Sequence, residues 1–184
     1  MTLLVDVLEE NGLDSIDAVL FALPGVGDVG KNAVELLNEA NDARAVARFI
    51  HPGLTPLARL DEDGLLAPPH LLAQRIDTEN GPSILTITGR GQPSESFQQH
   101  DFTTELLQHL AESGMKELIV LAGLMSTPEI KEAFAVATTS SHRVHLEEHG
   151  VDVRRDQPSG GAIGMSALMA SLAPLFGLQS VCAM

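Results

Sequence analysis

The segment Leu23-Pro-Gly-Val-Gly-Asp-Val-Gly-Lys-Asn32 decides the fold, because it joins an apolar strand to a helix through three closely spaced glycines. The apolar run before it, residues 17–23, is typical of a buried strand, and residues 33–37 predict a helix. A strand, a glycine-rich turn and a helix in this order indicate an α/β unit. Backbone N–H groups in such a turn point outward at the positive end of the helix dipole, which suits phosphate.

Two phosphate-binding motifs fit this turn incompletely. Gly25, Gly27 and Gly30 match G-x-G-x-x-G, but the acidic residue expected about twenty positions later for a ribose hydroxyl is missing. Residues 25–31 also match the start of the P-loop motif, but Asn32 replaces the hydroxyl residue that holds Mg²⁺. Two interpretations remain: an anion-binding turn that uses Gly25, Gly27, Gly30 and Lys31, or a turn whose glycines only allow close packing and positive φ. We favour the second, because each motif lacks a residue that does its chemistry.

The whole chain, residues 1–184, predicts a single three-layer α/β domain with a mainly parallel central sheet and additional antiparallel hairpins, because strand-like and helical patterns alternate. The predicted strands are residues 18–23, 43–50, 83–88, 117–122, 133–138, 151–154 and 180–183. The predicted helices are residues 29–38, 101–112, 143–149 and 162–172. Residues 51–82 contain five prolines and two turn signals, which predict a hairpin excursion from the main sheet.

Charge and composition exclude several classes of protein. The chain has 25 acidic and 11 basic residues, a net charge of −14 that disfavours binding to nucleic acid. Cys182 is the only cysteine, so an intramolecular disulfide is impossible and a reducing cytoplasm fits. The last charged residue is Asp156, but the helical part of the tail, residues 162–173, is shorter than the about 20 residues of a membrane span. The N-terminus lacks the basic region of a signal peptide. We therefore expect a cytoplasmic protein that binds neither nucleic acid nor membrane.

The predicted helix at residues 162–172 is apolar or small on every side. Large apolar residues recur on one side at helical spacing, while the other side carries small residues, among them Gly164, Ala167 and Ser171. We expect the large side to meet the sheet. The small side meets either another helix of the core or a second subunit, and the sequence leaves both open.

No residue pattern predicts catalysis or a metal site. His142, His145 and His149 share a helical face, and residues 145–149 match H-x-x-E-H, a zinc motif. A catalytic zinc needs a third protein ligand, and the chain has no glutamate after Glu148, so a solvated polar face is the better interpretation. The G-x-S-x-G motif is absent, and Cys182 lies in an apolar strand where a thiol is usually inert. We expect no catalytic residue, metal or cofactor, although enzymatic activity stays open.

Several segments together resemble the proteasome assembly chaperone 2 family, in its archaeal and bacterial form. They are the glycine turn, Gly89-Arg-Gly-Gln-Pro93 after a strand, the apolar run at residues 118–123, and residues 158–169 leading into residues 177–182. The resemblance implies a fold similar to nucleoside phosphorylases without their chemistry. It also implies association into homo-oligomers and action on α subunits of the proteasome core particle, without nucleotide consumption.

The chain departs from this family in two ways. Some members dock through a C-terminal tail with a penultimate tyrosine, whereas this sequence has no tyrosine and ends Val181-Cys-Ala-Met184. Relatives also usually continue past this strand, so we expect that the chain lacks a C-terminal extension. Our leading hypothesis is a non-enzymatic oligomeric interaction protein that serves as a proteasome assembly chaperone. The alternative is an enzyme or ligand-binding protein that uses the turn from Gly25 to Lys31 for a phosphorylated or nucleoside-like small molecule.

Overall fold

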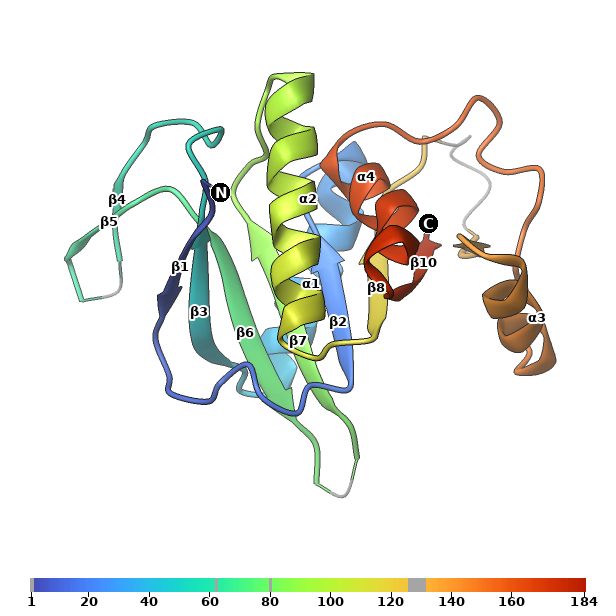
Figure 1. Ribbon diagram of the computed structural model, residues 1–184, viewed down its shortest axis with the longest axis horizontal. Helices are drawn as coiled ribbons and strands as arrows, with labels where there is room; N and C mark the ends of the chain where they lie inside the picture. The colour runs from blue at the N-terminus through green and yellow to red at the C-terminus, as the bar shows by residue number, and fades with distance from the viewer. Residues whose placement is uncertain (1, 62, 80, 126–131) are drawn as a thin grey trace.

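A computed structural model describes residues 2–61, 63–79, 81–125 and 132–184 of the chain. Its centre is an eight-stranded sheet in the order β1-β3-β6-β7-β2-β8-β10-β9, with helices on both faces (Figure 1). The strands are β1 (Leu4–Val7), β2 (Ala18–Ala22), β3 (Arg44–Ile50), β4 (Arg59–Leu60), β5 (Leu66–Ala67), β6 (Leu71–Asp77), β7 (Ser83–Gly89), β8 (Glu117–Leu121), β9 (Ala135–Ala137) and β10 (Gln179–Ala183). The helices are α1 (Val29–Ala40), α2 (Ser96–Glu112), α3 (Ser140–Glu148) and α4 (Met165–Leu172), with short 3₁₀ turns η1 (Val26–Asp28) and η2 (Ala173–Phe176).

The parallel centre of the sheet confirms the predicted α/β class. Strands β7, β2, β8 and β10 run parallel, with Phe21 of β2 in register with Ile87 on one side and Val120 on the other. All three side chains are fully buried. Continuous apolar runs are expected for parallel strands that are covered by helices on both faces.

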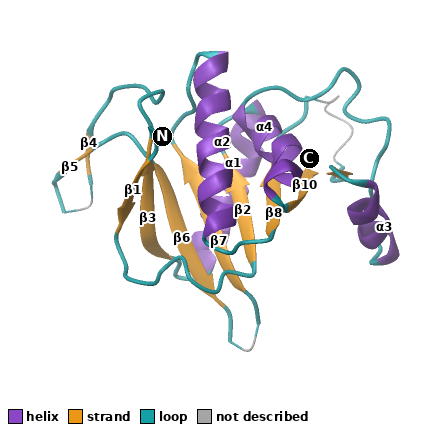
Figure 2. Cartoon of the chain, viewed as in Figure 1, coloured by secondary structure: helices purple, strands orange, loops and turns teal. Residues whose placement is uncertain are grey.

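The other half of the sheet is antiparallel, so the sheet is mixed rather than mainly parallel. Strands β1, β3 and β6 add to β7 in antiparallel register, and β9 adds to β10 at the far edge. The predicted excursion at residues 51–82 is therefore too long, because β6 belongs to the main sheet. Among the residues that the structure describes, only β4 and β5 form a separate two-stranded hairpin, which projects from the sheet edge (Figure 2).

Three predicted elements differ from those in the structure. Residues 151–154 do not form a strand, since Val153 makes only an isolated bridge to Ala135. Helix α4 begins at Met165 rather than at residue 162, because Gly164 has φ +92°, outside the helical range. Helix α2 begins at Ser96, five residues before the predicted start.

The helices divide between the two faces of the sheet. His109 of α2 contacts Phe49, which pairs with Leu71, whereas Asn38 of α1 bonds to Gln74, three residues further along β6. Because side chains alternate along a strand, α1 and α2 lie on opposite faces, and Figure 1 shows α2 and α4 in front with α1 behind. The core between α2, α4 and the sheet includes fully buried Phe21, Phe49, Phe102 and Met165. No helix in the described part of the chain is long and apolar enough to cross a bilayer.

Candidate functional site

The glycine turn after β2 is closed by its own residues. Asp28 adopts a left-handed conformation with φ +51°, and its carboxylate accepts a hydrogen bond of 3.1 Å from the Gly25 backbone N–H. In return the Asp28 N–H donates to the Gly25 carbonyl oxygen, also at 3.1 Å. Gly27 has φ +61°, which explains a glycine there. The aspartate side chain therefore binds one of the N–H donors that would otherwise face an anion.

Two glycines bring α1 directly against the end of β8. A Cβ atom on Gly30 would collide with the Leu121 carbonyl oxygen, and one on Gly123 would collide with the Val26 carbonyl oxygen. The helix N-terminus can take this position only because both side chains are absent. This geometry agrees with the interpretation of the turn as a packing device.

Lys31, the cation of the predicted anion site, is engaged elsewhere on the helix. Its Nζ donates to Glu35 Oε1 at 2.6 Å, one turn further along α1. The structure thus brings Gly25, Gly27 and Gly30 into one turn, but directs the Lys31 ammonium to a carboxylate. Binding of a phosphate there would have to compete with Glu35.

A cavity of about 340 Å³ lies beside the turn, where β8 and β10 end. Its apolar wall includes Val29, Leu124, Phe134 and Met184, and its polar wall includes Glu132 and Arg154. The carboxyl ends of parallel strands are the usual ligand position in open α/β sheets, and this volume is within the range of small-molecule sites. Sequence reasoning missed it, because its residues come from segments far apart in the chain.

The charged wall of this cavity is locally paired. The Arg154 guanidinium lies 4.5 Å from the centre of the Phe134 ring and donates to Glu132 at 2.6 Å and to Asp152 at 3.3 Å. The hydrogen bond to Glu132 raises the pKa of Arg154 above its usual value. Two carboxylates around one guanidinium leave this wall slightly anionic, which disfavours a phosphate.

Helix α4 places its large side as predicted and leaves its small side partly open. Met165 and Met169 are fully buried, and α4 packs against α2, β8 and β10. On the other side Ala167 is half-buried and Ser171 is exposed. Gly164 ends the preceding loop beside Gln92, whose Oε1 accepts from the Met165 N–H at 2.9 Å. Contact of Gly164, Ala167 and Ser171 with a second subunit stays a prediction.

His142 and His145 lie in α3 and His149 follows it directly, and the ring centres of His142 and His145 are 6.5 Å apart, so the three lie along one side as predicted. His142 is buried, and its Nδ1 lies 3.1 Å from the Ser180 carbonyl oxygen of β10. His145 and His149 contact each other at the helix end, with ring centres 4.4 Å apart. Within the described residues, no three His, Cys, Asp or Glu side chains are placed to hold a metal ion.

The sequence model of the PAC2 family matches residues 19–184, nearly the whole chain. The chain belongs to the PAC2 family. Among solved PAC2-like structures, Pyrococcus furiosus PbaB, an archaeal proteasome activator, is similar with a TM-score of 0.84 and 20% identity, over 100% of this chain and 80% of PbaB. No curated protein sequence matches this chain.

Two further structures share the fold. P. furiosus PbaA, an archaeal homologue of proteasome-assembly chaperone, has a TM-score of 0.73 and 19% identity over 98% of this chain and 74% of PbaA. The Mycobacterium tuberculosis proteasome-assembly chaperone homologue Rv2125 has a TM-score of 0.67 and 17% identity over 90% of this chain and 73% of its own. None of the three is described as a phosphorylase, so the likeness to that fold stays a prediction.

Proposed function

We propose that this PAC2 family protein is a non-enzymatic, cytoplasmic interaction protein that self-associates and assists assembly of the proteasome core particle. The observation that carries the proposal is the likeness over 98% of this chain to PbaA, a homologue of proteasome-assembly chaperone. Rv2125, also described as a proteasome-assembly chaperone homologue, supports the same role, and the likeness to PbaB, a proteasome activator, supports a connection with the proteasome.

The local chemistry of the glycine turn supports an architectural role rather than catalysis. The Gly25 N–H is bonded to Asp28 and the Lys31 ammonium to Glu35. The turn is thereby committed to internal contacts that hold α1 against β8. We infer that its glycines were retained for architecture.

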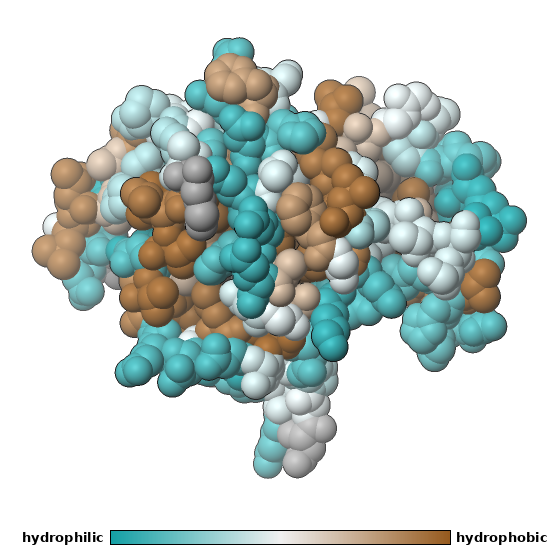
Figure 3. Space-filling model, in the orientation of Figure 1, coloured by the Kyte–Doolittle hydropathy of each residue, from teal (hydrophilic) through white to brown (hydrophobic). Residues whose placement is uncertain are grey.

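The β4–β5 hairpin offers a surface for contact with α subunits. Its apolar side chains are unusually exposed: Leu60 by 70%, Leu65 by 65% and Leu66 by 72%. They gather at the left edge of the space-filling view (Figure 3). Exposed apolar clusters on a projecting hairpin are typical of protein interaction sites. This surface requires no tyrosine, a residue that the 184-residue sequence lacks.

The test is reconstitution of the host's own core particle from purified α and β subunits, with and without this protein. We expect faster appearance of peptidase activity in its presence, and no acceleration by L60Q/L66Q. A variant with the same changes at exposed leucines elsewhere, L36Q/L175Q, is the matched control and should accelerate assembly like the wild type. Assembly at one rate with and without the wild-type protein would reject the chaperone role.

The cavity beside the turn favours a second candidate function, the binding of a nucleoside-like small molecule. A phosphorylated ligand would instead need the turn itself, where Lys31 is bonded to Glu35. A ligand present at 100 times its Kd would stabilise the protein by about 2.7 kcal/mol. A thermal-shift screen with nucleosides and nucleotides tests this, and loss of the shift in Lys31→Ala would place the ligand at the turn. A flat screen would leave the chaperone role as the only candidate.

A further inference from the structure

One face of the antiparallel half of the sheet lies beyond the edge of helix α1. Helix α1 packs on β2, β7 and β8 and reaches β6 through the Asn38–Gln74 hydrogen bond of 2.9 Å. Leu72 precedes Gln74 by two residues, so it shares this face. Leu72 pairs with Arg48 of β3, so Arg48 lies on this face too. Ile50 follows Arg48 by two residues and pairs with Leu4 of β1, so both also lie on it. We call this surface, made by Leu4, Ile50 and Leu72, the open face.

The open face carries three apolar side chains where solvent-facing strands are normally polar, and the ion pair of Asp6 and Arg48 lies among them. Leu4 is 64% exposed, and Ile50 and Leu72 are half-buried. Antiparallel sheets that face water on one side usually alternate apolar inward and polar outward residues. The one guanidinium that the structure describes on this face, that of Arg48, is neutralised by Asp6 at 3.3 Å and Asp61 at 3.7 Å.

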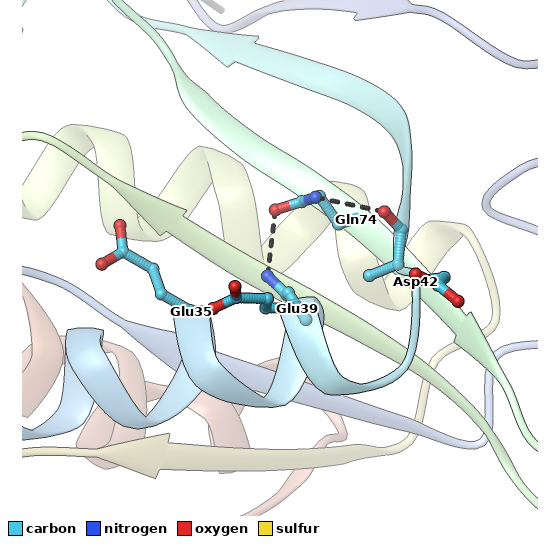
Figure 4. A pocket seen from close by; sticks show the side chains of 6 residues that line it. Glu35, Glu39, Asp42 and Gln74 are labelled. Carbon is cyan, nitrogen blue, oxygen red and sulfur yellow. Dashed lines mark hydrogen bonds between the residues drawn. The ribbon is translucent and has the colours of Figure 1, made fainter.

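An acidic groove borders the open face where α1 meets β6. Figure 4 shows Glu35, Glu39 and Asp42 around this groove of about 360 Å³, with Gln74 of β6 at its floor. Gln74 is fixed there by Asn38 and by the Ala43 carbonyl oxygen. The carboxylates are not clustered as metal ligands in the described part of the chain.

We propose that the open face and this acidic groove bind a basic amphipathic helix of a partner protein, which lies on β1, β3 and β6 beside α1. Three strands spaced about 4.8 Å apart span about 10 Å between their outer axes, close to the diameter of one helix. Strands β3 and β6, of seven residues each, are about 23 Å long, the length of a helix of about 15 residues, whereas β1 has four residues and covers only part of this length. The apolar stripe of the partner helix covers Leu72, Ile50 and Leu4. Its basic flank pairs with Glu39 and Asp42, and with the Glu35 carboxylate, which also holds Lys31.

Charge distinguishes this partner from a second copy of the chain. Helices α2 and α4 contain no lysine or arginine, Lys31 of α1 is paired with Glu35, and Arg143 of α3 lies 3.9 Å from Glu147. None of the described helices therefore has a basic flank to offer. With a net charge of −14, a second copy would add repulsion to the groove.

The test uses a fluorescein-labelled 16-residue helical peptide with a leucine stripe flanked by lysines, titrated with the full-length protein and followed by anisotropy. We expect saturable binding that weakens between 50 and 300 mM salt as screening grows. E35Q/E39Q should weaken it about tenfold, and L4Q should also weaken it. The matched controls are E112Q/E148Q, which removes the same charge elsewhere, and L36Q, since Leu36 is 65% exposed on the solvent side of α1.

Each outcome decides the proposal. Binding that is lost in E35Q/E39Q and L4Q but kept in both controls supports it. Equal binding by all variants, equal binding of a peptide with glutamates in place of the lysines, or no saturable binding would overturn it. A dimer that L4Q disrupts, without peptide binding, would assign the open face to a second copy and also overturn it. The inference goes beyond the proposed function, because the open face lies on β1, β3 and β6, whereas the surface proposed for α subunits is the separate β4–β5 hairpin.

Discussion

Gly30 of α1 faces the carbonyl oxygen of Leu121 at the end of β8 so closely that a Cβ atom has no room. The contact fixes the height of the helix above the sheet and thereby the position of the whole glycine turn. The glycine at this position, which is typical of nucleotide-binding turns, is therefore required here by the packing of α1 on β8.

Gly30→Ala should destabilise the protein by about 1–3 kcal/mol in urea denaturation, because either α1 or β8 must shift. In a helix without this contact the same change would stabilise by about 1 kcal/mol, so the sign of the effect is decisive. Gly91→Ala is the control, since nothing lies within 4 Å of its Cβ position. A G30A protein at least as stable as the wild type would refute the close packing of α1 on β8.

Asn38 joins α1 to two strands and should be the most sensitive polar residue of the helix. It is 6% exposed, donates to Gln74 at 2.9 Å and accepts from the Thr86 hydroxyl at 2.8 Å. Asn38→Ala removes the donor to Gln74 Oε1 and leaves the Thr86 hydroxyl only its 3.2 Å bond to the Gln74 carbonyl oxygen, which should cost about 1–3 kcal/mol of unfolding free energy. Exposed Asn32 of the same helix provides the control, and N32A should change stability by less than about 0.5 kcal/mol. Equal effects of N38A and N32A would argue against this network.

Stability should fall as the pH is lowered from 7.5 to 5.5, because burial lowers the pKa of both His51 and His109. Nearby carboxylates, Glu105 and Asp101 at His51 and Glu112 at His109, oppose this shift without reversing it. The unfolded chain takes up protons near a pKa of about 6.5, whereas the folded chain does so only at lower pH. More protons on the unfolded state mean that acid favours unfolding in this window.

His109→Leu removes one of these groups and should flatten the pH dependence of the melting temperature. His109 Nε2 is buried without a partner among the described residues, so this variant loses no hydrogen bond at that atom. His100→Leu, on the exposed side of α2, serves as the control. A pH dependence in H109L as steep as in the wild type would contradict the assignment.

Cys182 should react slowly with thiol reagents in the folded protein, because burial raises its pKa to about 11. At pH 8 the thiolate fraction is then about 200-fold lower than for a free cysteine with a pKa of about 8.5. Reaction with Ellman's reagent should be at least this much slower in buffer than in concentrated urea. Similar rates in the two solvents would place the thiol at the surface.

The sequence was sufficient for the parallel centre of the sheet and for β3 of its antiparallel half, but it did not predict β1 or β6. Strands such as β2 and β8 are continuous apolar runs, because both of their faces are buried. Strand β6 was missed, since Gln74 and Arg75 interrupt its apolar pattern. Both are satisfied by contacts distant in sequence: Gln74 by Asn38, and Arg75 by the Asp14 carbonyl oxygen at 2.7 Å.

The turn and the cavity likewise depend on contacts between segments distant in sequence, which the sequence alone does not reveal. The glycine spacing correctly located a strand-to-helix turn, but the collision that a Gly30 Cβ would make with the Leu121 carbonyl oxygen depends on tertiary positions. The cavity combines Val29, Leu124, Phe134 and Arg154 from four separate segments. No local pattern marks such a combination. The acidic groove was equally hidden, because it forms only when α1 packs beside β6.

The most direct test of the proposed chaperone role is native mass spectrometry of this protein co-expressed with the α subunits of its own host's proteasome. We expect a defined complex whose mass is that of this protein and α subunits in fixed stoichiometry, and its loss in L60Q/L66Q. Free α subunits beside this protein alone, at every expression ratio, would contradict a role in proteasome assembly.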